Sequence, residues 1–153
     1  MRLVRLGDVV ALGEAEAKVT TLGSGHEGRT IDALDPPAWG PAAGNDTSLV
    51  RRCHQLRKTP LSNWDLDDLR LMIGQQISLP ILMPRAIDVL AQNPLAEGIF
   101  PGDLLFMVLT VDASYWHANV EQWDRVDGIV DSLAATYEYV RGPIDHFKFG
   151  IWK

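Results

Sequence analysis

Several features that would assign a function are missing from this sequence. Its 153 residues contain one cysteine, Cys53, which rules out an internal disulfide and favours a reducing compartment. The four histidines are scattered, so no structural zinc site is expected. The longest aliphatic or aromatic run, residues 104–109, is far shorter than the roughly 20 residues that cross a membrane. Acidic residues also interrupt the stretch that a signal peptide would need, so we expect a cytoplasmic protein.

Positive charge is scarce in the second part of the chain. The formal net charge is −6, and residues 1–63 carry 8 basic and 7 acidic side chains, whereas residues 64–153 carry 6 and 13. An acidic surface repels a phosphate backbone, so direct binding of nucleic acid is disfavoured. A basic protein partner or plain solubility are the two interpretations that remain.

The composition, 46% apolar and 22% charged, is typical of one soluble globular domain that buries a core. Residues 1–45 hold seven of the thirteen glycines and are interpreted as an N-terminal arm and loop. Residues 46–153 are interpreted as a single helical domain. In the arm, residues 3–6 and 9–12 are candidate strands of a hairpin, although residues 15–18 suit a helix equally well.

Apolar residues at helical spacing predict helices from residue 46 onward. The first begins near Asp46 or Thr47 and ends before Pro60. Its remaining face carries four cations, which are more typical of a solvated face than of a nucleic-acid site: Arg51, Arg52, Arg57 and Lys58.

The next two helices have the clearest buried stripes. Asn63 is the candidate cap of one, and Pro80 suits the first turn of the other, where Pro84 is also tolerable. Three aspartates complement the dipole of the first of these helices: Asp65, Asp67 and Asp68. The two stripes are predicted to lie in the core: Leu66, Leu69, Met72 and Ile73, then Leu82, Met83, Ala86, Ile87 and Leu90.

The last part of the chain is predicted to be helical as well. Residues 104–109 are apolar all round, so periodicity fits a buried helix or a buried strand, and Asp103 as a cap favours the helix. Asn119 with Gln122 resembles a capping box that starts a helix over residues 120–139. Residues 142–153 alternate apolar and other side chains, which is typical of a short strand or a packed arm. The predicted fold is mainly α, a compact bundle of about five helices, to which the arm and tail add at most a short β-hairpin.

Two motifs with possible chemistry are weak. Residues 23–28 match the glycine pattern of a dinucleotide-binding turn, but Pro36 and Pro37 leave no room for the helix that must follow, so a loop without a cofactor is expected. Cys53 lies beside His54, yet it falls on the apolar stripe of its helix, where an inert core cysteine is the simpler interpretation.

Trp116 and Trp123 lie seven residues apart and share one helical face with Val120. An aromatic stripe of this kind is more often core than interface. A rim of acidic residues around it would instead have the composition of an anchor for a basic partner.

Five segments carry a resemblance to a known family. They are Leu-Val-Arg-Arg-Cys-His-Gln-Leu-Arg-Lys-Thr-Pro-Leu at 49–61, Asp-Leu-Arg-Leu-Met-Ile-Gly-Gln-Gln-Ile at 68–77, Leu-Pro at 79–80, Asn-Pro-Leu-Ala-Glu-Gly at 93–98 and Pro-Gly-Asp-Leu-Leu at 101–105. In this order they resemble the immunity proteins of bacterial contact-dependent growth inhibition (CDI) systems, over about residues 39–125. The first 38 residues and the aromatic tail lie outside the resemblance.

The resemblance implies a cytosolic, non-catalytic protein that binds and blocks the C-terminal toxin domain of a large surface-delivered toxin. Toxin domains of such systems are commonly nucleases with basic clefts, which agrees with the acidic second part of this chain. Toxin-binding surfaces vary within such systems, so the resemblance supplies no binding residue.

The candidate toxin-binding residues are therefore acidic side chains and one tryptophan in the predicted helical domain. They are Glu97, Asp103, Asp112, Trp116, Glu121, Asp124, Asp127 and Asp131. Two other functions stay open: a small cysteine/histidine enzyme that uses Cys53, and an adaptor unrelated to toxins that binds through the Trp116 face.

Overall fold

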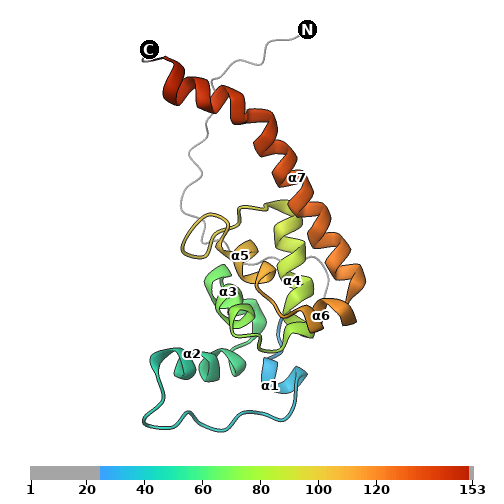
Figure 1. Ribbon diagram of the computed structural model, residues 1–153. Helices are drawn as coiled ribbons and strands as arrows, with labels where there is room; N and C mark the ends of the chain where they lie inside the picture. Colours follow the sequence, from blue (N-terminus) through green and yellow to red (C-terminus); the bar gives the residue numbers. More distant parts are fainter. Residues whose placement is uncertain (1–24, 152–153) are drawn as a thin grey trace.

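The computed structural model describes residues 25–151, and every regular element in this range is a helix (Figure 1). This confirms the mainly α fold class. The elements are α1 (Ile31–Leu34), α2 (Ser48–Arg57), the 3₁₀-helix η1 (Leu61–Asn63), α3 (Leu66–Gly74), α4 (Leu79–Gln92), α5 (Asp103–Leu109), α6 (Ala113–Ala118), α7 (Val120–Asp145) and the π-helix η2 (His146–Gly150).

The expected β-hairpin has no counterpart in the described part of the tail. Residues 142–145 continue α7, and residues 146–150 form η2, so a strand there is the wrong prediction. The candidate strands at residues 3–6 and 9–12 lie outside the described residues.

The core lies between α3, α4 and α5, with α2 and the first half of α7 packed around it. The predicted stripe of α4 is fully buried, and Leu69, Met72 and Ile73 of α3 are at most 1% exposed. Ile31 of α1 is also fully buried in this core, although it belongs to the glycine-rich first part of the chain. Apolar periodicity therefore predicted the central packing correctly.

The caps of three helices differ from the predictions. Thr47 caps α2 as expected, but Asp65 and not Asn63 caps α3, because Asn63 belongs to η1 and the extended cap residue comes after it. Asp65 accepts a hydrogen bond from the backbone N–H of Asp68, whose own carboxylate accepts one from the N–H of Asp65. This is a capping box made of two aspartates.

Asn119 and Gln122 form no capping box either. The side-chain amide of Asn119 donates to the carbonyl of Tyr115, and Gln122 Oε1 accepts from the Tyr115 hydroxyl. A break between α6 and α7 is nevertheless present at Asn119, whose φ of −135° and ψ of 56° are not helical.

Pro84 lies in the second turn of α4, one turn later than predicted as tolerable. A proline there removes the N–H that would bond to the carbonyl four residues earlier, which is that of Pro80 in the first turn. The helix nevertheless continues to Gln92, with its buried stripe intact.

Arg57 is the clearest departure from the predicted solvated face of α2. Its side chain is only 3% exposed, and its Nε donates to Asp32 Oδ1 over 2.7 Å. Its Nη2 donates to the carbonyl of Asp35 over 2.7 Å, and its guanidinium lies 4.6 Å from the ring centre of Trp39. Arg57 therefore ties the segment after α1 to α2.

Helix α7 is longer than predicted and leaves the body of the protein. It ends at Asp145 and not near Tyr139. Figure 1 shows its second half running past the end of α4 and away from the other helices. Between residues 131 and 149, every residue except Leu133 and Val140 is exposed.

Candidate functional site

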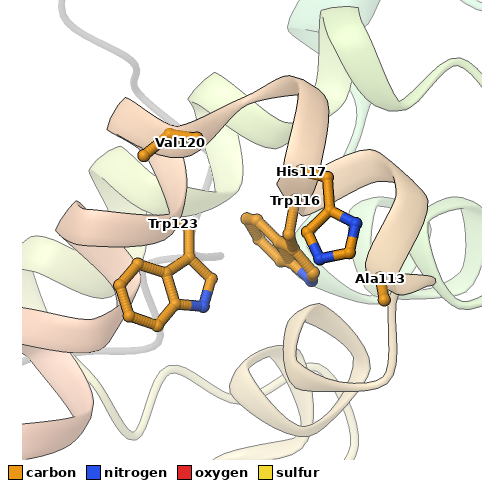
Figure 2. Close-up of a pocket in the computed structure, with 5 residues that line it drawn as sticks. All are labelled: Ala113, Trp116, His117, Val120 and Trp123. Carbon is orange, nitrogen blue, oxygen red and sulfur yellow. The ribbon is translucent and has the colours of Figure 1, made fainter.

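An apolar hollow of about 440 Å³ lies where α6 meets α7. Figure 2 shows the five side chains around it: Ala113, Trp116 and His117 from α6, and Val120 and Trp123 from α7. Trp116 is half-buried, while Trp123 is 46% and Val120 58% exposed. The two indoles therefore line an open surface and not the closed core that an aromatic stripe most often indicates.

A second hollow of about 280 Å³ continues the first toward α5. It shares Ala113, Trp116 and Trp123 with the first and adds Leu109 of α5 and Val130 of α7. Leu109 is 53% exposed. Together the two hollows form a groove, which we call the α6–α7 groove, with an apolar floor and walls from three helices.

Hydrogen bonds around Tyr115 fix the corner between α6 and α7. Its hydroxyl donates to Gln122 over 2.6 Å, and its carbonyl accepts from Asn119 over 2.8 Å. Burial raises the pKa of the Tyr115 hydroxyl, with the bond to Gln122 opposing that shift. The ring of Tyr115 meets that of Trp116 edge-on, at 5.4 Å between centres. The groove is thus held in shape by interactions behind it.

Acidic side chains follow one face of α7 beside the groove. Asp124, Asp127 and Asp131 are spaced three and four residues apart and are all exposed, and Asp127 also lines the second hollow. The nearest cation in sequence, Arg125, is bound to Asp88 of α4 at 2.9 Å. Among residues 25–151, no ion pair joins these three carboxylates, so the groove borders a negatively charged surface.

The other predicted carboxylates do not line the groove. Glu121 is three residues before Asp124, but it lies about 120° around α7 from Asp127 and lines neither hollow. Asp112 lines a separate polar hollow with Asp35 and Ser78. Glu97 is exposed in the connection between α4 and α5.

Asp103 is the first residue of α5 and not, as was predicted, its N-cap. The N-cap is Gly102, whose φ of +84° suits glycine. Its carboxylate instead accepts hydrogen bonds from the backbone N–H groups of Gly98, Ile99 and Phe100. Burial acts to raise the pKa of Asp103, but these three bonds and the charge of Arg70 outweigh it and hold the pKa below its usual value. Its side chain is 14% exposed, so Asp103 shapes a loop and is not part of the groove.

Eight residues of the groove were not among the predicted site residues: Leu109, Val111, Ala113, His117, Val120, Trp123, Val126 and Val130. A signal for three of them exists in the sequence, because Leu109, Trp116, Trp123 and Val130 follow one another at intervals of seven residues. His117 carries no such signal, because it directly follows Trp116 and so lies about 100° around α6.

The residues proposed for an enzyme do not form a reactive pair. Cys53 is 3% exposed, and burial raises the pKa of its thiol. His54 instead contacts Trp39 edge-on at 4.9 Å between ring centres, and its Nδ1 lies 2.9 Å from the carbonyl oxygen of Gly40. A nucleophilic cysteine needs access and a lowered pKa, and Cys53 has neither.

Other ligand chemistries find little support in the described part of the chain. Residues 25–28 of the glycine-rich motif form a turn that leads only to the four-residue α1. Within residues 25–151, no three histidine, cysteine or carboxylate side chains gather as metal ligands.

None of the helices between residues 25 and 151 has both the length and the apolar character to cross a membrane.

A family model described as CDI immunity proteins matches residues 33–126. The matched region runs from α1 to the first turns of α7 and ends at Val126, which is buried in the core. No curated protein and no solved structure matches the chain.

Proposed function

The chain belongs to the CDI immunity proteins and is an immunity protein for a CDI toxin; from that premise we propose that it binds the C-terminal toxin domain of its cognate toxin and neutralises it. The α6–α7 groove, with its acidic border, is the surface that we assign to this contact. The observation that carries the assignment is the meeting of Trp116 and Trp123 at an open apolar hollow beside Asp127.

The shape and chemistry of the groove suit an anchor site. Binding energy at protein interfaces concentrates in buried aromatic side chains that fill or line pockets near the centre of the contact. Trp116 and Trp123 offer such area, and the bonds of Tyr115 to Gln122 and Asn119 keep the pocket open before binding. A pre-formed site loses less conformational entropy on association.

The acidic border determines which kind of partner the groove attracts. Asp124, Asp127 and Asp131 present three negative charges along one helix face, whereas the only cation among residues 120–131 is held by Asp88. Charges of this kind attract a basic partner over a distance and set the association rate more than the final affinity. We therefore propose a basic toxin surface as the partner.

A nuclease domain fits that description best, because a nucleic-acid cleft must itself be basic. In this proposal the acidic border of the groove takes the place that the phosphate backbone of the substrate would occupy. The immunity protein itself contributes no catalytic group. Cys53 is expected to resist alkylation in the native protein and to react on unfolding, and rapid native labelling would contradict this part of the proposal.

An inhibition assay with the purified cognate toxin domain tests the proposal. Toxin activity on RNA and on DNA is measured while the immunity protein is titrated in. The proposal predicts loss of nuclease activity that is complete once the immunity protein matches the toxin in amount. Full activity in excess immunity protein, without a complex on size-exclusion chromatography, would contradict it. If the immunity protein binds and inhibits a toxin that is not a nuclease, the proposed neutralisation would stand and the nuclease assignment would be wrong.

A further inference from the structure

The apolar stripe of α7 continues beyond the body of the protein. Its first members pack into the core: Val126 is 4% exposed, and Val130 and Leu133 pack against buried residues. The same alternation of four- and three-residue steps then continues where no packing occurs. The full stripe on α7 is Val126, Val130, Leu133, Tyr137, Val140 and Ile144.

The second half of this stripe is open. Tyr137 is 57% and Ile144 39% exposed. Phe147 and Phe149, which follow in η2, are 70% and 66% exposed. Helix α4, which covers the first half of α7, ends at Gln92, and no described helix takes its place further along (Figure 1). Apolar surface of this extent generally marks a contact.

The first described residues of the chain lie against α4. The Glu27 carboxylate binds Arg85 of α4 at 2.7 Å. The backbone N–H of Ser62 also donates a hydrogen bond to the backbone carbonyl of Glu27. Arg85 is three residues from Asp88 on α4, and Asp88 binds Arg125 of α7. The described part of the chain therefore begins near α4, the helix that covers the first half of α7.

The length and composition of residues 1–24 suit the open stripe. From Arg125 to Ile144 the helix axis rises by about 28 Å, whereas 24 extended residues reach up to about 80 Å. Residues 3–12 contain six large aliphatic side chains: Leu3, Val4, Leu6, Val9, Val10 and Leu12.

Charge separates this surface from the one assigned to the toxin. Residues 1–24 carry three basic and three acidic side chains, and residues 132–151 carry two of each. Neither segment has the excess of negative charge that borders the α6–α7 groove. Both also lie outside residues 33–126, which the family model matches.

We propose that residues 1–24 of this chain pack along the second half of α7 and cover the stripe from Tyr137 to Ile144. A tethered segment is present at a high effective concentration, which favours it over a separate partner of equal affinity. The contact is intramolecular and is made without toxin.

Photo-crosslinking in the full-length chain tests this proposal. The photoreactive residue p-benzoylphenylalanine replaces Tyr137, which is exposed enough to accept it without disturbing the core. The matched control carries the same group at Ala135, which is also exposed but lies about 200° around the helix from position 137. Crosslinked peptides are identified by mass spectrometry, and monomers are separated from dimers by gel electrophoresis.

The proposal predicts that position 137 crosslinks to peptides from residues 1–24 within the monomer, several-fold more than position 135 does. Val9→Asp with Val10→Asp in the full-length chain should remove that crosslink and speed amide hydrogen exchange in residues 132–145. Crosslinks only between two copies, only to added toxin domain, or equally from both positions would overturn it. Absence of any crosslink to residues 1–24 would overturn it as well.

Discussion

Trp116 of α6 and Trp123 of α7 line one hollow, although Asn119 interrupts the helix between them. Seven residues of continuous helix would place the two indoles one above the other on a single face. The break instead turns α7 away from α6, so that the indoles become two walls of a pocket. The apolar surface of both indoles is therefore accessible to a binding partner.

Trp123→Ala should weaken the complex with the toxin domain, because it removes a wall of both hollows that make up the groove. Truncation of an aromatic anchor at an interface costs about 2–4 kcal/mol, and the loss should lie mainly in a faster dissociation rate. Surface plasmon resonance measures it. Tyr139→Ala is the matched control, since Tyr139 is 86% exposed on the distant half of α7, and it should bind like the wild type. Equal effects of the two variants would refute the anchor role of Trp123.

Asp127→Lys should slow association with the toxin domain, whereas Glu121→Lys should change it much less. Both residues are exposed on α7, and each change raises the net charge by two units, but only Asp127 lines the groove. The expected difference is about tenfold at low ionic strength and should shrink as salt screens the charges. Stopped-flow fluorescence at two salt concentrations measures it. The same association rate for both variants would mean that net charge matters and its position does not.

Asp103→Asn should destabilise the protein at neutral pH by about 1–3 kcal/mol, because three backbone N–H groups lose a charged acceptor. The pKa of Asp103 is lowered in the folded protein, so its stabilising contribution is complete above the unfolded-state pKa near 3.8 and is lost as the pH falls through the folded-state pKa. The free energy of unfolding should therefore fall less steeply below pH 4 in the variant than in the wild type.

Urea denaturation between pH 2 and 7 checks this prediction. Asp131→Asn serves as the control, because Asp131 is exposed on α7 and its change should stay within about 0.5 kcal/mol. Parallel pH profiles for the wild type and Asp103→Asn would show that the carboxylate does not stabilise the loop.

Arg57→Met should be among the most destabilising single changes in α2. It leaves the carboxylate of Asp32 without its cation and the carbonyl of Asp35 without its donor. Breaking a buried ion pair on one side costs about 3–5 kcal/mol. Arg51→Met, at an exposed position of the same helix, is the control. Thermal and urea unfolding of both variants measure the difference, and similar midpoints would contradict the role given to Arg57.

Apolar periodicity predicted α3 and α4 because a helix that buries one face must repeat its apolar residues every three or four positions. Arg57 shows where that reasoning fails. Its position in the last turn of α2 suits an exposed cation, but its partner Asp32 lies 25 residues earlier, beyond the reach of any local pattern. A contact between distant segments has no periodic signature.

The acidic residues show the same difference between what local spacing predicts and what depends on contacts between segments. The spacing of Asp124, Asp127 and Asp131 already places them on one helix face, and Glu121, three residues before Asp124, follows the same spacing. Which of these carboxylates borders the groove depends on how α7 packs against α6 and α5, so the spacing alone could not single out Asp127. Asp103 could not be assigned from spacing either, because its carboxylate turns back to three N–H groups of the preceding loop. The groove itself depends on the angle between two helices, which the sequence marks only by the break at Asn119.

Hydrogen–deuterium exchange of the immunity protein, free and bound to its toxin domain, shows which surface the toxin covers. The assignment of the toxin contact to the α6–α7 groove predicts slower exchange on binding in residues 113–131, where α6 and the first half of α7 form the groove, with little change in α2 and α3. A tight complex that protects α2 or the loop at residues 98–100 and leaves residues 113–131 unchanged would contradict it.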